Sequence, residues 1–279
     1  MLQYADDIKL FLSVPEHNGE LQQLQLQSDI NKVVNWSAQW KLPINTEKCS
    51  YMIISKQKGN TATNLLHSGY WCNGTLLVRE HQHNDLGVYF VSDWSFQHHI
   101  EDIIHKSLKM SALIRKCFKF TSLDVKLRLY TTFVRPKLEY CSVIWSPFKK
   151  GEIETIEKVQ RCFTKFLLYN SSMDYNDCLN ILQLPTLKKR RDMLDVCLCF
   201  KIINDMIPLI RMTDLNFIIC SSERRSCDLM SVMSNRKQID AEFAHHVRSL
   251  WNSIPCAIRC SSSYSSFVVN LHKNYNIFK

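Results

Sequence analysis

The stretch Leu2-Gln3-Tyr4-Ala5-Asp6-Asp7-Ile8-Lys9-Leu10-Phe11 places two adjacent carboxylates between short apolar segments. The pattern predicts two short strands within residues 2–12, joined by a turn at Asp6-Asp7. Mg²⁺ prefers hard oxygen ligands and often shares them with substrate phosphates, and a pair of such ions can stabilise both reacting oxygens of a phosphoryl transfer. A solvated Asp-Asp turn is the alternative, because the dipeptide alone has low specificity.

The composition is that of a folded, moderately basic protein. The chain has 279 residues, which is enough for one large or two modest domains, and 46% of them are hydrophobic. The net charge of +9 suits a polyanionic partner, although proteins that never bind nucleic acid can be equally basic. Glycine is scarce, and neither common glycine-rich phosphate loop occurs.

The same composition predicts an intracellular protein, cytoplasmic or nuclear and not secreted. No apolar run approaches the roughly 18 residues that span a membrane, and the acidic start is unlike a secretory signal. The 12 cysteines are therefore expected as reduced thiols. A zinc cluster is a weaker alternative, since no C-x₂-C pair anchors it. Its candidate ligands are Cys197, Cys199, Cys227, His245, His246, Cys256 and Cys260.

After the opening hairpin, the chain alternates between helical and extended patterns up to residue 92. A helix is predicted from Glu20 to Trp40. Its apolar stripe is expected in the core and its glutamines on the wet side; the stripe is Leu21, Leu24, Ile30, Val33, Val34 and Trp40, and the glutamines are Gln22, Gln23, Gln25 and Gln27. Strands are predicted at 51–54, 75–78 and 85–90. Gly87 lies inside the last of these, where glycine often marks the close approach of another backbone; judged by itself, this glycine is interpreted as a bulge.

Three segments of this first part resemble the reverse transcriptases of non-LTR, LINE-type retrotransposons. Tyr4-Ala5-Asp6-Asp7 resembles their Y-A-D-D catalytic hairpin. The segment from Trp36 to Cys49 resembles the W-x-x-x-W-x-L-x-x-N-x-x-K-C run that carries motif D. The run Asp85-Leu86-Gly87-Val88 resembles the D-L-G-V segment near the primer grip.

Residues 93–279 are predicted to be mostly helical, and the resemblance continues through them. Helices are predicted at 100–114, 125–134, 153–166, 174–184, 187–203 and 243–251, with a loop-rich segment at 211–237. Counterparts of family motifs are Val134-Arg135-Pro136, Glu157-Lys158-Val159-Gln160-Arg161 and Trp251-Asn252-Ser253-Ile254-Pro255. The resemblance implies an α+β fold: residues 1–92 are the C-terminal part of a polymerase palm, and residues 93–279 are a helical thumb and C-terminal region.

The resemblance also implies site residues. Asp6 and Asp7 would bind Mg²⁺ or Mn²⁺ and act in catalysis, and Lys48 would neutralise or protonate the departing pyrophosphate. Leu86 and Gly87 would lie at the primer. Independently, the run Lys188-Lys189-Arg190-Arg191 can bind a phosphate backbone, or it can be a solvated helix start. The implied partners are RNA and RNA/DNA hybrid, with no membrane and no small-molecule cofactor.

Only Met1 to Ala5 precede Asp6, whereas the family places another metal-binding aspartate and the fingers N-terminal to the hairpin. We therefore expect a truncated reverse transcriptase that is inactive alone, because one hairpin cannot hold two Mg²⁺ ions about 3.5–4 Å apart. A separate chain that supplies the missing half is one alternative. A non-catalytic RNA- or DNA-binding module and a helical interaction protein are two others.

Overall fold

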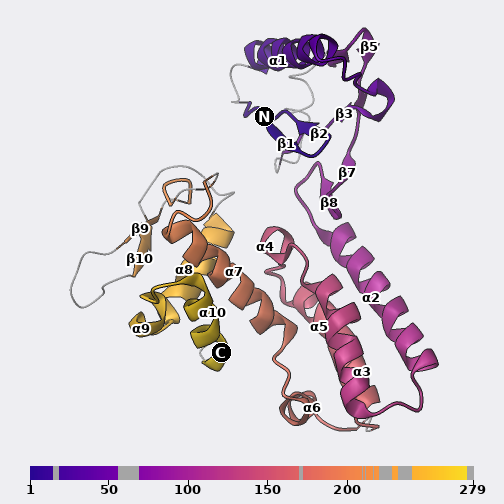
Figure 1. The fold of residues 1–279 in the computed structure, drawn as a ribbon, viewed down its shortest axis with the longest axis vertical. Helices are drawn as coiled ribbons and strands as arrows, with labels where there is room; N and C mark the ends of the chain where they lie inside the picture. Colours follow the sequence, from indigo (N-terminus) through magenta and orange to yellow (C-terminus); the bar gives the residue numbers. More distant parts are fainter. Residues whose placement is uncertain are drawn as a thin grey trace. The chain divides into compact units, whose positions relative to one another are not determined.

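The computed structural model describes residues 1–14, 19–55, 69–169, 172–208, 210, 212–215, 217–219, 228–231 and 241–274. The chain divides into two compact units, Met1–His99 and Ile100–Lys279 (Figure 1). The division falls inside a long helix, whereas the sequence predicted a boundary near residue 93. Among the described residues, no helix combines the length and the apolar character that crossing a membrane requires.

Unit 1 consists of short two-stranded ladders and one long helix. Its elements are β1 (Leu2–Tyr4), β2 (Asp7–Lys9), α1 (Gly19–Gln39), the 3₁₀ turn η1 (Thr46–Lys48), β3 (Ser50–Tyr51), β4 (Trp71–Cys72), β5 (Thr75–Leu76), β6 (Val78–Arg79), β7 (Gln82–Asp85) and β8 (Val88–Val91). Antiparallel pairs form between β1 and β2, β4 and β5, and β7 and β8, and β3 pairs with β6 in parallel. The strands predicted at 51–54 and 75–78 are therefore shorter or divided.

Helix α1 forms where predicted but buries a different face. Leu21, Leu24 and Trp40 are exposed, so the expectation that the apolar stripe forms a core is wrong for these three residues. The glutamine side is not simply wet either. The Gln27 side-chain amide donates to the carbonyl of Trp71 (2.7 Å) and accepts from the Trp71 amide (2.8 Å), as a neighbouring strand would. The glutamine therefore packs α1 onto β4, and the leucines remain at the surface.

The segment predicted as one strand at 85–90 is instead a tight hairpin. Strands β7 and β8 pair in the register Asp85↔Val88, with Leu86 and Gly87 as the two-residue turn. Leu86 has φ +47° and Gly87 has φ +84°, which is the left-handed pair that matches the twist of a hairpin. The bulge interpretation of Gly87 is therefore wrong; glycine is needed here for the turn.

Unit 2 is mostly helical. It begins within α2 (Gln97–Cys117) and contains α3 (Leu123–Leu129), the π-helical turn η2 (Tyr130–Val134), the 3₁₀ turn η3 (Arg135–Leu138), α4 (Ser142–Trp145), α5 (Lys150–Leu167), α6 (Tyr175–Leu182), α7 (Leu187–Ile203), β9 (Phe217–Ile219), β10 (Leu229–Ser231), α8 (Ala241–Ser253), α9 (Cys256–Arg259) and α10 (Tyr264–Lys273). Strands β9 and β10 form an antiparallel pair within the segment predicted to be loop-rich. Ser263 caps α10 by accepting from the Ser266 amide.

The helix predicted to end at Arg135-Pro136 continues through the proline with altered geometry. Proline has no amide hydrogen and its ring collides with the preceding turn of an α-helix. The chain widens into the π-turn, where the Arg135 amide bonds the carbonyl of Tyr130, and then tightens into η3. Val134 and Leu138 are fully buried on either side of Pro136, so the Val-Arg-Pro motif is a packed joint.

The C-terminal helices of unit 2 close around one hydrophobic core. Phe200 of α7 stacks on Phe267 of α10, with ring centroids 4.3 Å apart, and Trp251 of α8 lies 5.9 Å from Phe267. Asn252 bonds both backbone groups of Leu229, at 2.9 and 3.0 Å, and so holds β10 against α8. The Trp251-Asn252 pair is therefore structural: one residue fills the core and the other satisfies a strand edge.

Candidate functional site

The Asp6-Asp7 hairpin forms as predicted, with its turn shifted by one residue. Strands β1 and β2 pair in the register Tyr4↔Asp7, so Ala5 and Asp6 make the two-residue turn and Asp7 begins β2. Ala5 takes the left-handed conformation at φ +52°, which a residue other than glycine adopts only at a cost of about 1 kcal/mol or more. Both aspartates are exposed. The hairpin thus presents two carboxylates to solvent.

Among the described residues, an ion pair links this hairpin to the β7–β8 hairpin of unit 1. Lys9 of β2 donates to the carboxylate of Asp85, the last residue of β7. Both side chains are partly shielded from solvent, which strengthens the pair compared with a fully exposed one. The structure therefore brings the Asp6-Asp7 hairpin and the Leu86-Gly87 turn into one region, although 76 residues separate Lys9 from Asp85 in sequence.

Lys48, by contrast, makes no described contact with the acidic pair. It ends η1, which Asn45 caps by accepting from the Glu47 amide at 3.1 Å. The lysine is exposed, and in the described part of the chain it forms no ion pair with Asp6 or Asp7. Its predicted role in phosphoryl transfer stays a prediction.

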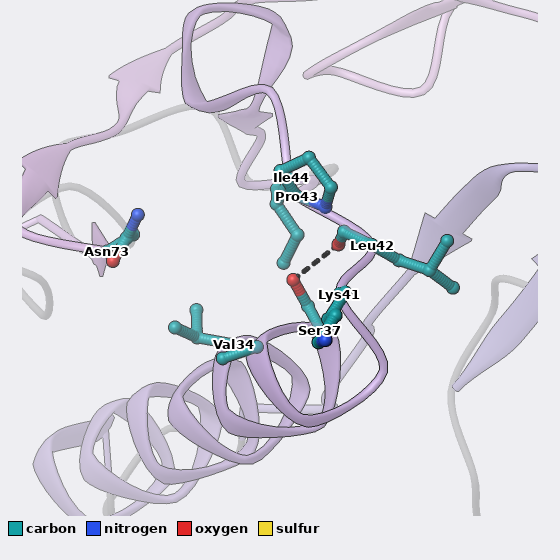
Figure 2. Close-up of a pocket in the computed structure, with 8 residues that line it drawn as sticks. Val34, Ser37, Lys41, Leu42, Pro43, Ile44 and Asn73 are labelled. Atoms are coloured by element: carbon teal, nitrogen blue, oxygen red, sulfur yellow. Dashed lines mark hydrogen bonds between the residues drawn. The ribbon is translucent and has the colours of Figure 1, made fainter.

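The motif that precedes Lys48 lines a shallow pocket at the end of α1 (Figure 2). The pocket holds about 260 Å³. Its lining residues are Val34, Ser37, Ala38, Lys41, Leu42, Pro43, Ile44 and Asn73. The Ser37 hydroxyl donates to the Leu42 carbonyl at 2.6 Å and so fixes the chain where it leaves the helix. Lys41 is the one charged side chain in this lining, which contains no carboxylate, histidine or cysteine.

The basic run at the start of α7 does not form one exposed cationic surface. Arg191 is only 1% exposed, and all three of its guanidinium nitrogens lack a hydrogen-bond partner among the described residues. Arg190 makes a two-pronged contact with the Glu139 carboxylate, and Lys188 pairs with Asp192 at 3.1 Å. Of the four cations, Lys188 and Arg190 therefore form ion pairs within the fold, and Arg191 is buried. The nucleic-acid role of Lys188-Lys189-Arg190-Arg191 stays a prediction; among the described residues, Lys189 forms no ion pair.

A buried carboxylate explains how a helix can begin with cations. Glu157 of α5 accepts from the backbone amides of Leu187 (3.0 Å) and Lys188 (3.3 Å) and from the Tyr175 hydroxyl. A carboxylate at the N-terminus of α7 satisfies amides that have no partner in the helix and complements the helix dipole. Burial and the Glu157 charge both raise the pKa of Tyr175, so its hydroxyl remains a donor.

Gln160, one turn further along α5, completes this network. It accepts from the Tyr130 hydroxyl at 2.7 Å and donates to the Tyr175 hydroxyl and the Pro185 carbonyl, both at 2.9 Å. The sequence contains a signal for this pair. Glu157 and Gln160 interrupt the apolar face of α5, and polar residues on a buried face require partners.

A second polar cluster joins α7 to α8. Asp192, Asp195 and His246 each offer one ligand atom, and these atoms lie within 4.8 Å of one another. Burial raises the pKa of Asp195 to about 7. Burial acts in the same direction on Asp192, but hydrogen bonds from His246 and Lys188 hold its pKa below the ordinary value.

This cluster is the one group among the described residues that brings three metal-ligating side chains together. Lys188 already pairs with Asp192, and the buried Arg191 lowers the pKa of Asp195 by its charge. Lys188 and His246 therefore balance the Asp192 carboxylate, and we assign the cluster to a buried polar network in which Asp192 is the ion-paired member. The described residues do not assemble the Cys/His zinc cluster that the sequence offered as an alternative. The Sγ atoms of Cys256 and Cys260 lie 3.5 Å apart, and Cys227 falls outside the described residues.

Comparison with known proteins gives three relatives for this chain. It is 27% identical over 166 residues to the RNA-directed DNA polymerase from mobile element jockey of Drosophila funebris, which is 56% of this chain and 17% of the relative. It is 26% identical over 139 residues to the jockey polymerase of Drosophila melanogaster, covering 48% of this chain and 14% of that protein. An uncharacterized protein of Caenorhabditis elegans, B0403.1, is 26% identical over 99 residues, 34% of this chain and 50% of the relative.

No family model and no solved structure matches the chain. The chain spans less than a fifth of the length of either jockey polymerase. Both jockey polymerases are mobile-element proteins, as are the retrotransposon reverse transcriptases that the sequence motifs resemble. The chain is therefore a distant relative of the RNA-directed DNA polymerases of mobile elements.

Proposed function

We propose that this chain is the C-terminal part of a non-LTR retrotransposon reverse transcriptase. Unit 1 carries the end of the palm with its catalytic hairpin, and unit 2 is the thumb and C-terminal region. The observation that carries the proposal is the hairpin itself. Asp6 lies in its two-residue turn and Asp7 begins β2, both are exposed, and Lys9 anchors the hairpin to Asp85, beside the Leu86-Gly87 turn.

The surface of unit 1 supports its assignment as part of a larger assembly. Exposed apolar side chains follow its hairpin, its helix and the chain after the helix: Leu2, Tyr4, Leu21, Leu24, Trp36, Trp40 and Leu42. Monomeric proteins rarely expose large contiguous apolar patches unless a partner covers them. We infer that the fingers and the rest of the palm cover this surface in the complete enzyme.

We further propose that the 279 residues alone do not polymerise DNA. Two catalytic Mg²⁺ or Mn²⁺ ions about 3.5–4 Å apart need carboxylates from more than one strand. Among the described residues, neither Asp6 nor Asp7 belongs to a group of three metal-ligating side chains. A further carboxylate must therefore come from polypeptide outside the described residues, supplied in the same chain or by another.

Primer extension on an RNA template with Mg²⁺ or Mn²⁺ tests both statements. The chain alone should give no extension. A fusion that places the fingers and first palm segment of a jockey polymerase before Met1 should extend the primer, and Asp6→Asn and Asp7→Asn should each abolish that activity. Extension by the isolated chain that disappears in either variant would refute the claim of inactivity. A folded fusion whose activity survives both substitutions would refute the assignment of the hairpin.

Binding of nucleic acid without catalysis is the second candidate function, and the net charge of +9 favours it. Contacts with phosphates release counterions, so the affinity for labelled RNA or RNA/DNA hybrid should fall steeply with salt. Absent or salt-independent binding would leave a helical interaction protein as the remaining candidate. In that case, replacing Asp6 and Asp7 by Asn would change no measured property.

A further inference from the structure

One end of unit 2 gathers positive charge that no described carboxylate balances. Arg115 of α2 lies 5.0 Å from the ring centre of Phe166 and donates to the Cys162 carbonyl at 3.0 Å. The Arg115 Nε atom is buried and has no hydrogen-bond partner among the described residues. In the described part of the chain, no carboxylate oxygen lies within 4 Å of the guanidinium.

The buried ammonium of Lys126 repeats this arrangement in α3. Lys126 donates to the Lys119 carbonyl (3.1 Å) and the Tyr169 hydroxyl (2.8 Å) and lies 5.2 Å from the centre of the Tyr169 ring. Neutral oxygens and ring faces solvate this charge without cancelling it. Asp124 is the one acid within residues 115–128, and it forms no described ion pair with Lys126 or Arg115.

Two aromatic side chains at this end of unit 2 are exposed to solvent. Phe120 is 95% exposed, and the Lys119 ammonium lies 5.6 Å from its ring centre. Tyr169 is 77% exposed and has φ +51°, a left-handed conformation that costs about 1 kcal/mol or more for a residue other than glycine. The hydrogen bond from Lys126 joins the Tyr169 side chain to the segment that carries Phe120.

We propose that Lys116, Lys119, Phe120 and Tyr169, here called the basic-aromatic tip, bind a single strand of RNA or DNA. The lysines contact the backbone phosphates, and unpaired bases stack on the two rings. The tip lies where the end of α2, the start of α3 and the end of α5 meet (Figure 1). This inference rests on the proposed function and names the surface of unit 2 that recognises the nucleic acid.

The chemistry of the tip favours a single strand over a duplex. Inside a duplex, both faces of a base are stacked on neighbouring bases. An unpaired base has a free π-face that can stack on an exposed aromatic ring. Phe120 has no polar atom with which to read a base edge, so binding should tolerate any sequence. Arg115 and Lys126, which have no carboxylate partner among the described residues, raise the potential over the same surface and attract phosphates.

Fluorescence anisotropy of the full chain with a labelled single-stranded RNA tests the proposal, with an RNA/DNA hybrid as a second probe. Phe120→Ala and Tyr169→Ala should each weaken single-strand binding, since each lost stacking contact corresponds to roughly 5- to 140-fold in affinity. Lys116→Gln and Lys119→Gln should each reduce the slope of log affinity against log salt by about 0.7. Circular dichroism would establish that each variant is folded.

The stretch Phe148-Lys149-Lys150 provides a matched control, because it also places an exposed phenylalanine beside two exposed lysines in unit 2. Replacing Lys149 and Lys150 by Gln should leave single-strand affinity within about twofold. Equal losses at both places would overturn the tip as a specific site. Binding that is normal in every tip variant would overturn this inference and leave the proposed function intact, whereas no binding by the unmodified chain would count against both.

Discussion

Removing the Glu157 carboxylate should destabilise unit 2 more than any other single change in a charged residue of α5. Glu157→Ala leaves the amides of Leu187 and Lys188 and the hydroxyl of Tyr175 without an acceptor. Hydrogen bonds to a charged group contribute about 1.5–3 kcal/mol each and are not additive. Arg191 also loses a countercharge, since burial lowers its pKa and Glu157 opposes that effect. We expect a loss of ~3–5 kcal/mol, in the range for breaking a buried charged network.

Thermal unfolding of the full chain, followed by circular dichroism, measures this loss. For a unit of this size ~3–5 kcal/mol corresponds to a fall in Tm of roughly 10 °C. Glu157→Gln keeps an acceptor but removes the charge, so its loss should be smaller. Glu154→Gln is the control: Glu154 lies on the same helix and pairs with Arg161 at the surface, where solvent screens the pair, so its loss should change the stability far less. A loss under about 1 kcal/mol in Glu157→Ala, or equal losses in Glu154→Gln and Glu157→Ala, would refute the reasoning.

Three further predictions use other features. Gly87→Ala should destabilise unit 1 by ~1 kcal/mol, because Gly87 has φ +84°. Gly151→Ala is the control: Gly151 lies in a helix with open space where a Cβ would be, so the substitution should stabilise unit 2 by about 0.5–1 kcal/mol. Chemical denaturation measures both changes in stability, and the same sign for both would contradict the turn assignment. Arg190→Ala should cost ~2 kcal/mol by leaving the Glu139 carboxylate without its bidentate partner, and Lys189→Ala, measured alongside, should cost almost nothing. Because the pKa of Asp195 is raised from 3.8 to about 7 in the folded protein, its contribution to stability is present below pH ~4 and is lost as the pH rises through 7; Asp195→Asn should flatten that decline, and an unchanged pH profile would argue against a buried, protonated carboxyl.

The sequence by itself determined the elements with strong periodicity. Alternation of short apolar segments around Asp6-Asp7 predicted the opening hairpin, because a two-residue turn between such segments has few other solutions. The 3.6-residue apolar period predicted α5, α6 and α7 within a few residues of their observed ends. Local motifs also indicated the relationship to retrotransposon polymerases, since they depend on residue identity and spacing alone.

The tertiary structure decided which side chains face water and which charges find partners. The helical periodicity of the sequence could not show that Leu21 and Leu24 are exposed while Gln27 hydrogen-bonds to β4. A helix face is buried only where another element of the fold covers it. The periodicity also could not show that Arg191 is buried. The sequence of four cations is compatible with a solvated helix start, and only the tertiary structure places Glu157 and Glu139, from distant segments, against the start of α7.

The hairpin Asp6-Asp7 marks the same division. Its residue types and turn are local properties, so the sequence alone identifies it. Its surroundings are not local: the ion pair between Lys9 and Asp85 forms only because two segments far apart in the chain fold together. A metal site needs carboxylates that converge from several such segments, and convergence in space is a property that only the tertiary structure determines.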